Sequence, residues 1–388
     1  MNRRDFIQAG MSIGFGGVLL PSSKEALGDV ARADALPQMI EDLTDWLLER
    51  LQTRGNEPIR IPAGDFKISR PLDVSGRQLT GAGAEQTRLI YVGQADTPFL
   101  SVSCSAHASS EIRDLTLIRS ADGGGTAIFV DSDRACYFDY RRRLLIDNVT
   151  FRGVNVKRGV AGWISTPSWQ CCIDLGDAWG VYISRIDAVG AYDIRLPATQ
   201  FDKSVFLRTN AQGGILSARI SSVTATSFYR GIEIGARTFF FISDCDFAAC
   251  CDGIISVHGP KDGFSEGRIV QSLINAQRVG IHLYKTAWRE ISGVAINRHK
   301  EGYKSGDWVG MRLDGVFKSW INRIRFQVDV TRGEFRGEGI GLQLRQCSDL
   351  IVSECMFGLG LDCDVQQAGS QRISLSNNLN HAPSLCGQ

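Results

Sequence analysis

A five-residue frame led by glycine, with apolar residues at its second and fourth positions, returns through the second half of this sequence. It occurs as GIEIG (231–235), GIISV (253–257), GIHLY (280–284), GMRLD (310–314), GLQLR (341–345) and GLGLD (358–362). Successive copies stand roughly 20 to 35 residues apart, the spacing of a solenoid of stacked coils. We expect each copy to be a short strand whose second and fourth side chains fill a core. We expect its glycine to mark the turn of each coil.

A second alternating frame, which begins with an aliphatic residue, accompanies the first. Examples are IRDLTLI (112–118), ISRIDAV (183–189), ISSVTAT (220–226), ISDCDF (242–247) and VSECMF (352–357). A propeller needs four strands per blade, and a sandwich would not give two frames in a fixed order. Strands that pair in parallel with their copies above and below predict an all-β fold, a parallel β-helix of about ten coils.

The composition is that of a soluble globular chain. Of 388 residues, 43% are apolar and 22% are charged, and the 42 glycines suit many tight turns between strands. The formal net charge is +1, so no overall field draws the chain toward nucleic acid. We therefore expect no nucleic-acid partner.

The first residues follow the pattern of an export signal. Arg3 and Arg4 precede an apolar, glycine-rich run from Phe6 to Leu20, which is too short to span a bilayer comfortably. The Arg-Arg-x-Phe-Ile sequence resembles the twin-arginine export signal, an address that a receptor reads. We expect residues 1–35 to be signal and spacer, with no stable membrane insertion, and the mature protein to be periplasmic or secreted.

A helix and a long strand-rich region follow the signal. Residues 36–52 carry apolar side chains at helical spacing, and Gly55 and Pro58 come next as stop signals. We expect a capping helix within 36–58 and a β-helix domain over 59–388.

The segment IPAGDFKISRPLDVSGRQLTGAGAEQTRLIYV (61–92) resembles the opening of the pectate-lyase-like superfamily. Proteins of that superfamily begin with a helical cap, then a strand of the type iPaG-x-y-x-i, then one of the type l-x-G-x-G-x-x-T-x-i. The resemblance implies a right-handed parallel β-helix with an N-terminal capping helix. It also implies a polysaccharide partner, although the same fold occurs in lyases, hydrolases, epimerases, phage tailspikes and adhesins. An exported β-helix further resembles the β-helix proteins of bacterial exopolysaccharide clusters.

No cofactor is expected from the sequence. Lyases of this fold use calcium, but no dense cluster of aspartates here calls for one. The oligomeric state is open between a monomer and a homotrimer in the manner of tailspikes.

Stacked coils bring equivalent outward positions into columns spaced by about 4.8 Å. The third and fifth letters of the glycine-led frame therefore predict a polar patch. Its members are the catalytic candidates His282, Tyr284 and Asp314 and the substrate-binding candidates Glu233, Arg312 and Arg345. Arginine can neutralise a sugar carboxylate, and histidine or tyrosine can move a neighbouring proton. The alternative is a solvated sheet face on which charged residues pair across strands.

The fifth position of the aliphatic-led frame supplies a second catalytic candidate. Asp187 and Asp246 would lie two coils apart, about 9–10 Å, with Thr224 between them. This separation is close to the upper limit for the two carboxylates of an inverting glycosidase. Asp244 is expected on the same face as a substrate-binding residue, and Ile274 is expected at the same position one copy later. The alternative is two surface aspartates next to turns.

The 11 cysteines and 7 tryptophans add further expectations. Cys245 and Cys355 fall at inward positions, where they would act as small buried hydrophobes. The odd number of cysteines leaves at least one free thiol. Trp169, Trp308 and Trp320 are expected in loops, where exposed rings would suit sugar stacking and buried rings would fill space beneath the loop.

Together these features predict an exported bacterial protein that processes an extracellular or periplasmic polysaccharide. It would act as a lyase or a glycoside hydrolase, in exopolysaccharide production or turnover. The alternative is a non-catalytic glycan-binding or scaffold protein that resembles a tailspike or an adhesin.

Overall fold

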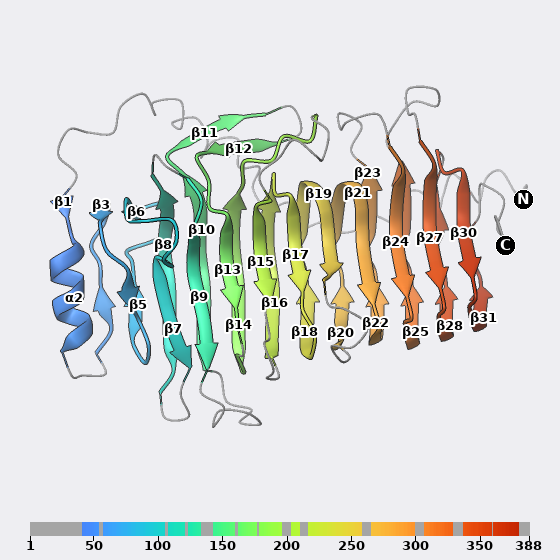
Figure 1. Ribbon diagram of the computed structural model, residues 1–388, viewed down its shortest axis with the longest axis horizontal. Helices are drawn as coiled ribbons and strands as arrows, with labels where there is room; N and C mark the ends of the chain where they lie inside the picture. The colour runs from blue at the N-terminus through green and yellow to red at the C-terminus, as the bar shows by residue number, and fades with distance from the viewer. Residues whose placement is uncertain are drawn as a thin grey trace, which may run out of the picture. The chain divides into compact units, whose positions relative to one another are not determined.

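The computed structural model describes most of the chain from residue 41 onward. The described residues are 41–53, 57–104, 108–120, 123–132, 143–159, 162–176, 178–195, 203–209, 216–257, 265–298, 306–328, 337–358 and 360–379. The predicted export signal, residues 1–35, lies outside them. Figure 1 shows the coils stacked in sequence order, from α2 (Thr44–Gln52) to β31 (Gln371–Ser376).

The coils build three parallel sheets, which we name A, B and C in the order in which a coil enters them from the aliphatic-led frame. Sheet A contains β2 (Ile59–Arg60), β5 (Gln78–Thr80), the first parts of β8 (Ser110–Arg119), β10 (Leu144–Gly153), β14 (Val181–Val189) and β16 (Leu216–Thr226), and then β18 (Thr238–Ser243), β20 (Ser265–Val270), β22 (Thr286–Ser292), β25 (Phe317–Asn322), β28 (Ser348–Ser353) and β31.

Sheet B takes the second parts of the strands that begin in sheet A. It contains β1 (Glu41–Asp42), β3 (Gly64–Ile68), β6 (Thr87–Tyr91), the second parts of β8, β10, β14 and β16, the first parts of β19 (Asp246–Ser256) and β21 (Leu273–Tyr284), and then β23 (Ala295–Arg298), β26 (Arg325–Val328) and β29 (Met356–Phe357).

Sheet C holds the glycine-led frames. It contains β4 (Leu72–Asp73), β7 (Leu100–Cys104), β9 (Thr126–Ser132), β13 (Cys171–Leu175), β15 (Val205–Thr209), β17 (Arg230–Ile234), the second parts of β19 and β21, and then β24 (Trp308–Asp314), β27 (Gly339–Arg345) and β30 (Cys363–Ala368). Outside the three sheets, β11 (Asn155–Arg158) and β12 (Trp163–Thr166) form an antiparallel hairpin.

The all-β prediction of a parallel β-helix is confirmed by this register. Every pairing within the three sheets is parallel, and each strand pairs with its equivalent in the coils before and after it. The coils wind in the right-handed sense that parallel crossover connections adopt.

In the coils from β8 onward, a residue in the left-handed region stands at the bend from sheet A to sheet B, whereas residues 81–86 form a longer connection between β5 and β6. The left-handed residue is Asp114 (φ 57°), Arg185 (φ 52°) or Asp244 (φ 53°) in three of the coils. The aliphatic-led frame is thus two short strands with a bend, not one continuous strand. Asp244, expected on the same face as Asp246, lies exposed at such a bend, after the end of β18 at Ser243 and before the start of β19 at Asp246.

Two expectations about register are wrong. Asp246 pairs with Leu273, and the buried Ile274 pairs with Phe247, so the predicted outward position at Ile274 was one residue late. Residues 358–362 are not a glycine-led strand, because β30 begins at Cys363 and pairs with β27 in their place. In both cases an apolar residue beside the true position imitates the alternation.

The leading glycines lie inside strands of sheet C, not at turns as expected. A Cβ atom on Gly280 would lie 2.2 Å from Ile296 Cγ2 and 2.5 Å from the Gly310 carbonyl oxygen. A Cβ atom on Gly253 would lie 2.4 Å from Ile274 Cγ2. The frame repeats its glycine because an inward side chain of sheet B packs directly against that strand.

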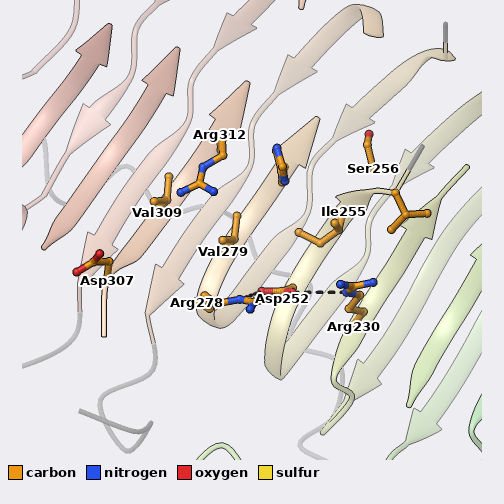
Figure 2. Close-up of a pocket in the computed structure, with 11 residues that line it drawn as sticks. Arg230, Asp252, Ile255, Ser256, Arg278, Val279, Asp307, Val309 and Arg312 are labelled. Carbon is orange, nitrogen blue, oxygen red and sulfur yellow. Dashed lines mark hydrogen bonds and ion pairs between the residues drawn. The ribbon is translucent and has the colours of Figure 1, made fainter. Parts of the chain in front are cut away.

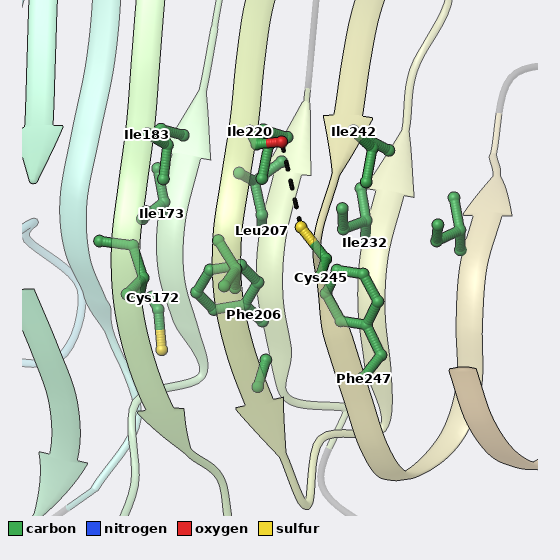
Figure 3. Packing of buried hydrophobic residues seen from close by; sticks show 14 of the residues in the cluster. Cys172, Ile173, Ile183, Phe206, Leu207, Ile220, Ile232, Ile242, Cys245 and Phe247 are labelled. Atoms are coloured by element: carbon green, nitrogen blue, oxygen red, sulfur yellow. Dashed lines mark hydrogen bonds between the residues drawn. The ribbon is translucent and has the colours of Figure 1, made fainter. Parts of the chain in front are cut away.

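One continuous apolar core runs through the coils. Figure 3 shows Ile183, Ile220 and Ile242 in line, one from each successive coil of sheet A. Cys245 and Cys355 are buried as predicted, and burial raises the pKa of the Cys245 thiol to about 12. Among the described residues Cys363 is disulfide-bonded.

The helix α2 stands against the first coil, where the fully buried Leu47 joins the core. The helix begins at Thr44, later than the predicted residue 36, because Glu41 and Asp42 form β1 and pair with β3. This pairing satisfies backbone groups that would otherwise be open at the end of sheet B. In the described part of the chain, no helix is long and apolar enough to cross a membrane.

Candidate functional site

A cavity of about 700 Å³ opens on the outer face of sheet C, over β17, β19, β21 and β24 (Figure 2). The residues around it combine three guanidinium groups, an imidazole, carboxylates and a small apolar floor. They are Arg230, Asp252, Ile255, Ser256, Val257, Arg278, Val279, His282, Asp307, Val309 and Arg312. Such a mixture is typical of a binding site with a few directional polar groups.

The predicted outward column of sheet C is present in the structure. His282 pairs in register with Arg312, and Tyr284 pairs with Asp314. On the next coil, Asp314 pairs with Arg345. Glu233 stands two coils before His282, with Ile255 between them. Of these candidates, His282 and Arg312 line the cavity, and the others stand beside it in the same columns.

His282 and Asp314 form a direct contact. His282 Nε2 lies 2.8 Å from Asp314 Oδ2, and both side chains are largely buried. The other carboxylate oxygen, Asp314 Oδ1, is buried and has no hydrogen-bond partner in the described structure. A carboxylate in this position fixes the orientation of an imidazole ring. The pair therefore has the geometry of a general base, His282, whose ring is oriented by the carboxylate of Asp314.

Of the three arginines in the cavity, Arg312 is the one that has no carboxylate within ion-pair distance among the described residues. Its Nε donates to Gln343 Oε1 at 2.6 Å. Partial burial, and then the positive charge of Arg345, lower the pKa of Arg312. Because its charge is only partly compensated, an anionic group entering the cavity would gain a strong, charge-assisted hydrogen bond there.

A second charged group in the cavity was missed by the sequence analysis. Figure 2 shows Asp252 between two arginines, and its side chain is only 1% exposed. Arg278 donates from Nε to Asp252 Oδ1 at 2.8 Å and from a terminal nitrogen to Oδ2, and Arg230 Nε lies 3.6 Å from Oδ2. Both guanidinium groups also face the Tyr229 ring, at 5.4 Å for Arg230 and 5.9 Å for Arg278.

Alternation in the sequence did not indicate this group. Arg230 and Asp252 directly precede the leading glycines of two frames, where strict alternation with the second and fourth positions would point both side chains inward. Arg278 stands outside the frame, in the segment of β21 that crosses from sheet B to sheet C. No local periodicity indicates it.

The predicted carboxylate pair lies on a different sheet. On sheet B, Asp187 pairs with Thr224, which pairs with Asp246 in the next coil. Desolvation and then the negative charge of Glu85 raise the pKa of Asp187, although its side chain reaches solvent, and desolvation raises the pKa of Asp246. Asp246 Oδ1 is buried without a hydrogen-bond partner in the described structure. Neither aspartate lines the cavity of sheet C.

Metal ligands do not gather in the described residues: no three His, Cys, Asp or Glu side chains lie close enough together there to hold an ion. The expected tryptophans are also placed differently. Trp308 lies in β24 and is fully buried, and Trp320 lies in β25 and is exposed, so both belong to strands and not to loops.

No protein-family model matches this chain. No curated protein matches it either. Among solved structures, it is similar to an N-terminal fragment of gene product 12 of bacteriophage Phi29, with 11% identity over 97% of this chain and 68% of that one (TM-score 0.45).

Two further solved structures are similar to this chain. One is tailspike protein 2 of the Escherichia coli O157:H7 bacteriophage CAB120, with 13% identity over 79% of this chain and 38% of that one (TM-score 0.40). The other is an exopolygalacturonase from Thermotoga maritima, with 10% identity over 86% of this chain and 88% of that one (TM-score 0.36). The chain thus spans less than two thirds of the tailspike.

Proposed function

We propose that the cavity of sheet C binds an acidic polysaccharide and cleaves it as a lyase. The observation that carries this proposal is the pair His282–Asp314, 2.8 Å apart, next to Arg312, which has no carboxylate partner among the described residues. A uronic acid residue carries both groups on which such a site can act. Its carboxylate can pair with Arg312, and the C–H bond next to that carboxylate is acidic.

The chemistry would follow from the position of these three side chains. Arg312 pairs with the sugar carboxylate and stabilises the negative charge that develops when the neighbouring proton is removed. His282 accepts that proton, and Asp314 stabilises the resulting imidazolium. A carbon–carbon double bond then forms as the glycosidic oxygen on the next carbon leaves. Tyr284, the next outward residue of β21, is the candidate to protonate that oxygen.

The test is to incubate the purified protein with polygalacturonate, alginate and a neutral glucan. Lyase action on the acidic polymers creates unsaturated uronates, which absorb in the ultraviolet. His282→Gln and Arg312→Gln are each expected to lower the rate by at least about 100-fold, because each removes a group acting on the developing charge. Arg325→Gln is the matched control, since Arg325 is exposed on sheet B away from the cavity. A rate that both cavity variants leave unchanged would overturn the proposal.

A second candidate function is glycoside hydrolysis by Asp187 and Asp246 on sheet B. Their register, two coils apart, sets a separation of about 9–10 Å. Desolvation raises the pKa of both carboxyls, which favours the protonated form that a general acid needs. Hydrolysis would give new reducing ends without ultraviolet absorbance. Asp187→Asn and Asp246→Asn would abolish it, while His282→Gln would not.

The finer expectations from the sequence belong to this proposal as well. Twin-arginine export to the periplasm or the medium would place the protein with polysaccharides made by the cell, in their production or turnover. Binding of polysaccharide without any cleavage product would instead support the non-catalytic alternative, a glycan-binding or scaffold protein.

A further inference from the structure

The outer face of sheet A carries a single file of large side chains, one per coil. Cross-strand register places them in one column: Leu145, Tyr182, Arg219, Phe241, Arg268, Glu290, Trp320 and Ile351. Phe241 is 42% exposed and Trp320 is 57% exposed. We call the segment from Tyr182 to Trp320 the aromatic strip. Neither the cavity of sheet C nor the aspartates of sheet B include any of its members.

Arginines separate the aromatic rings of the strip. The Arg219 guanidinium lies 5.6 Å from the centre of the Tyr182 ring and 5.2 Å from that of Phe241, so it is held between two rings. No carboxylate lies within ion-pair distance of Arg219 among the described residues. Arg268 is exposed and lies 3.8 Å from Glu290. The strip therefore offers positive charge as well as apolar faces.

A column of short polar side chains runs beside the strip. Two positions further along the strands it contains Ser184, Ser221, Ser243, Ser292, Asn322 and Ser353, with Val270 between Ser243 and Ser292. A shallow cavity of about 210 Å³, lined by Phe239, Phe241, Glu266, Gly267 and Arg268, opens at the middle of the strip. Rings, guanidiniums and hydroxyls in parallel lines match the faces, carboxylates and hydroxyls of an extended acidic sugar chain.

A second copy of this protein is a poorer occupant. A stable interface between copies buries about 800 Å² on each partner, with a contiguous apolar centre. The strip is bordered by serine and asparagine on one side, and by Phe239 and Glu266 on the other side at its middle. The exposed apolar side chains of its column, Phe241, Trp320 and Ile351, are interrupted by Arg268 and Glu290 and do not form a contiguous apolar centre.

We propose that the aromatic strip is a separate binding surface for an acidic polysaccharide chain that lies along the stack of coils. Phe241 and Trp320 contact the flat faces of sugar rings, and Arg219, held between two rings, pairs with a sugar carboxylate. The strip anchors a polymer without cleaving it. The proposal does not depend on the chemistry of the sheet C cavity.

Affinity electrophoresis of the full chain tests this proposal, with polygalacturonate, alginate or neutral dextran cast in the gel. The variants are Phe241→Ala, Trp320→Ala and Arg219→Gln, all at exposed or partly exposed positions. Each is expected to weaken retardation by the acidic polymers about threefold or more, and the triple variant to abolish most of it. Dextran is expected to retard none of them.

The controls are Met356→Ala and Arg325→Gln, an exposed apolar residue and an exposed arginine on sheet B. Both should leave retardation as in the parent protein. The cavity variant Arg312→Gln, even if it abolishes cleavage, should keep at least half of the retardation, which separates the two sites.

Two results would overturn the proposal. One is retardation that the triple variant leaves unchanged. The other is a change in sedimentation coefficient when Phe241 or Trp320 is replaced, which would show that the strip is an interface between copies.

Discussion

Most ion pairs in the part of the chain that the structure describes join residues of neighbouring coils. Arg185 pairs with Asp147, and Arg208 with Asp174, each across one interstrand spacing. Pairs with an exposed arginine contribute little to stability, because water and salt screen them. Asp252 differs, since its buried carboxylate needs Arg278, and losing that partner would leave an uncompensated charge.

The pair Arg185–Asp147 predicts a pH dependence of stability. Hydrogen bonds from Arg185, together with one from Ser184, hold the pKa of the largely buried Asp147 below its usual value of 3.8. A lowered folded-state pKa means that this stabilisation is present above about pH 4 and is lost as the pH falls through the folded-state pKa. Asp147→Asn should lower the free energy of unfolding by about 1–2 kcal/mol at pH 7, and the difference should shrink below pH 4.

Denaturant titrations at pH 7 and pH 3 measure both differences. Asp349→Asn is the control, because its pair with Arg372 has the same form but is exposed. Its effect should be much smaller at both pH values. An Asp147→Asn difference that is equal at pH 7 and pH 3 would contradict the assignment.

At the scale of single strands, the glycines of sheet C set how closely two sheets approach. Gly280 has room for no side chain, since the methyl group of alanine would meet Ile296 and the Gly310 carbonyl. Gly280→Ala is therefore expected to lower the free energy of unfolding by about 1–3 kcal/mol through overpacking. Chemical denaturation measures it. The double variant Gly280→Ala/Ile296→Ala should lose less unfolding free energy than the sum of the losses of the two single variants, because Ile296→Ala removes the collision with the new methyl group. Strict additivity would show that this collision is not the cause.

The strands themselves were largely predictable from the sequence. Alternation fixes which side chains point inward, so the columns of His282 with Arg312 and of Asp187 with Thr224 and Asp246 have the predicted register. The bends were not predictable, because the left-handed residue between sheets A and B has no constant type and is aspartate, arginine or serine in different coils. The repeated glycine is visible in the sequence, but its pattern alone indicates a turn. Glycine is required there because a side chain of another strand fills the space that a Cβ atom would occupy.

At the scale of the whole stack, a solenoid needs its ends closed. Leu47 of α2 is fully buried at the first coil, and β1 pairs with β3 beside it. Leu47→Asp should lower the free energy of unfolding by at least about 2 kcal/mol and cause self-association that rises with concentration, as the first coil becomes accessible. Light scattering measures the association. Glu49→Ala, an exposed change in the same helix, should do neither, and a monodisperse Leu47→Asp variant would contradict this role of the helix.

The candidate site was only half predictable for a reason that belongs to this scale. Columns of a β-helix gather residues that repeat in phase, and His282, Arg312 and Asp314 repeat in phase. Asp252 and Arg278 meet because one stands in sheet C and the other in the segment that enters it, so their contact depends on the path of the chain around a corner. Periodicity carries no information about that path.

The short bend between sheets A and B in the coils from β8 onward has a consequence for how such a protein can change in evolution. One left-handed residue stands at each of these bends, and a single inserted residue would reverse the faces of the strand that follows, whereas residues 81–86 form a longer connection at the same corner between β5 and β6. The aromatic strip on sheet A and the aspartates on sheet B are thus tied to a fixed geometry, coil after coil. Insertions can be accepted at the other two corners, as the hairpin β11–β12 between sheets B and C illustrates. New specificity is therefore expected to arise at the borders of sheet C, where the cavity lies, while the faces of sheets A and B change by substitution alone.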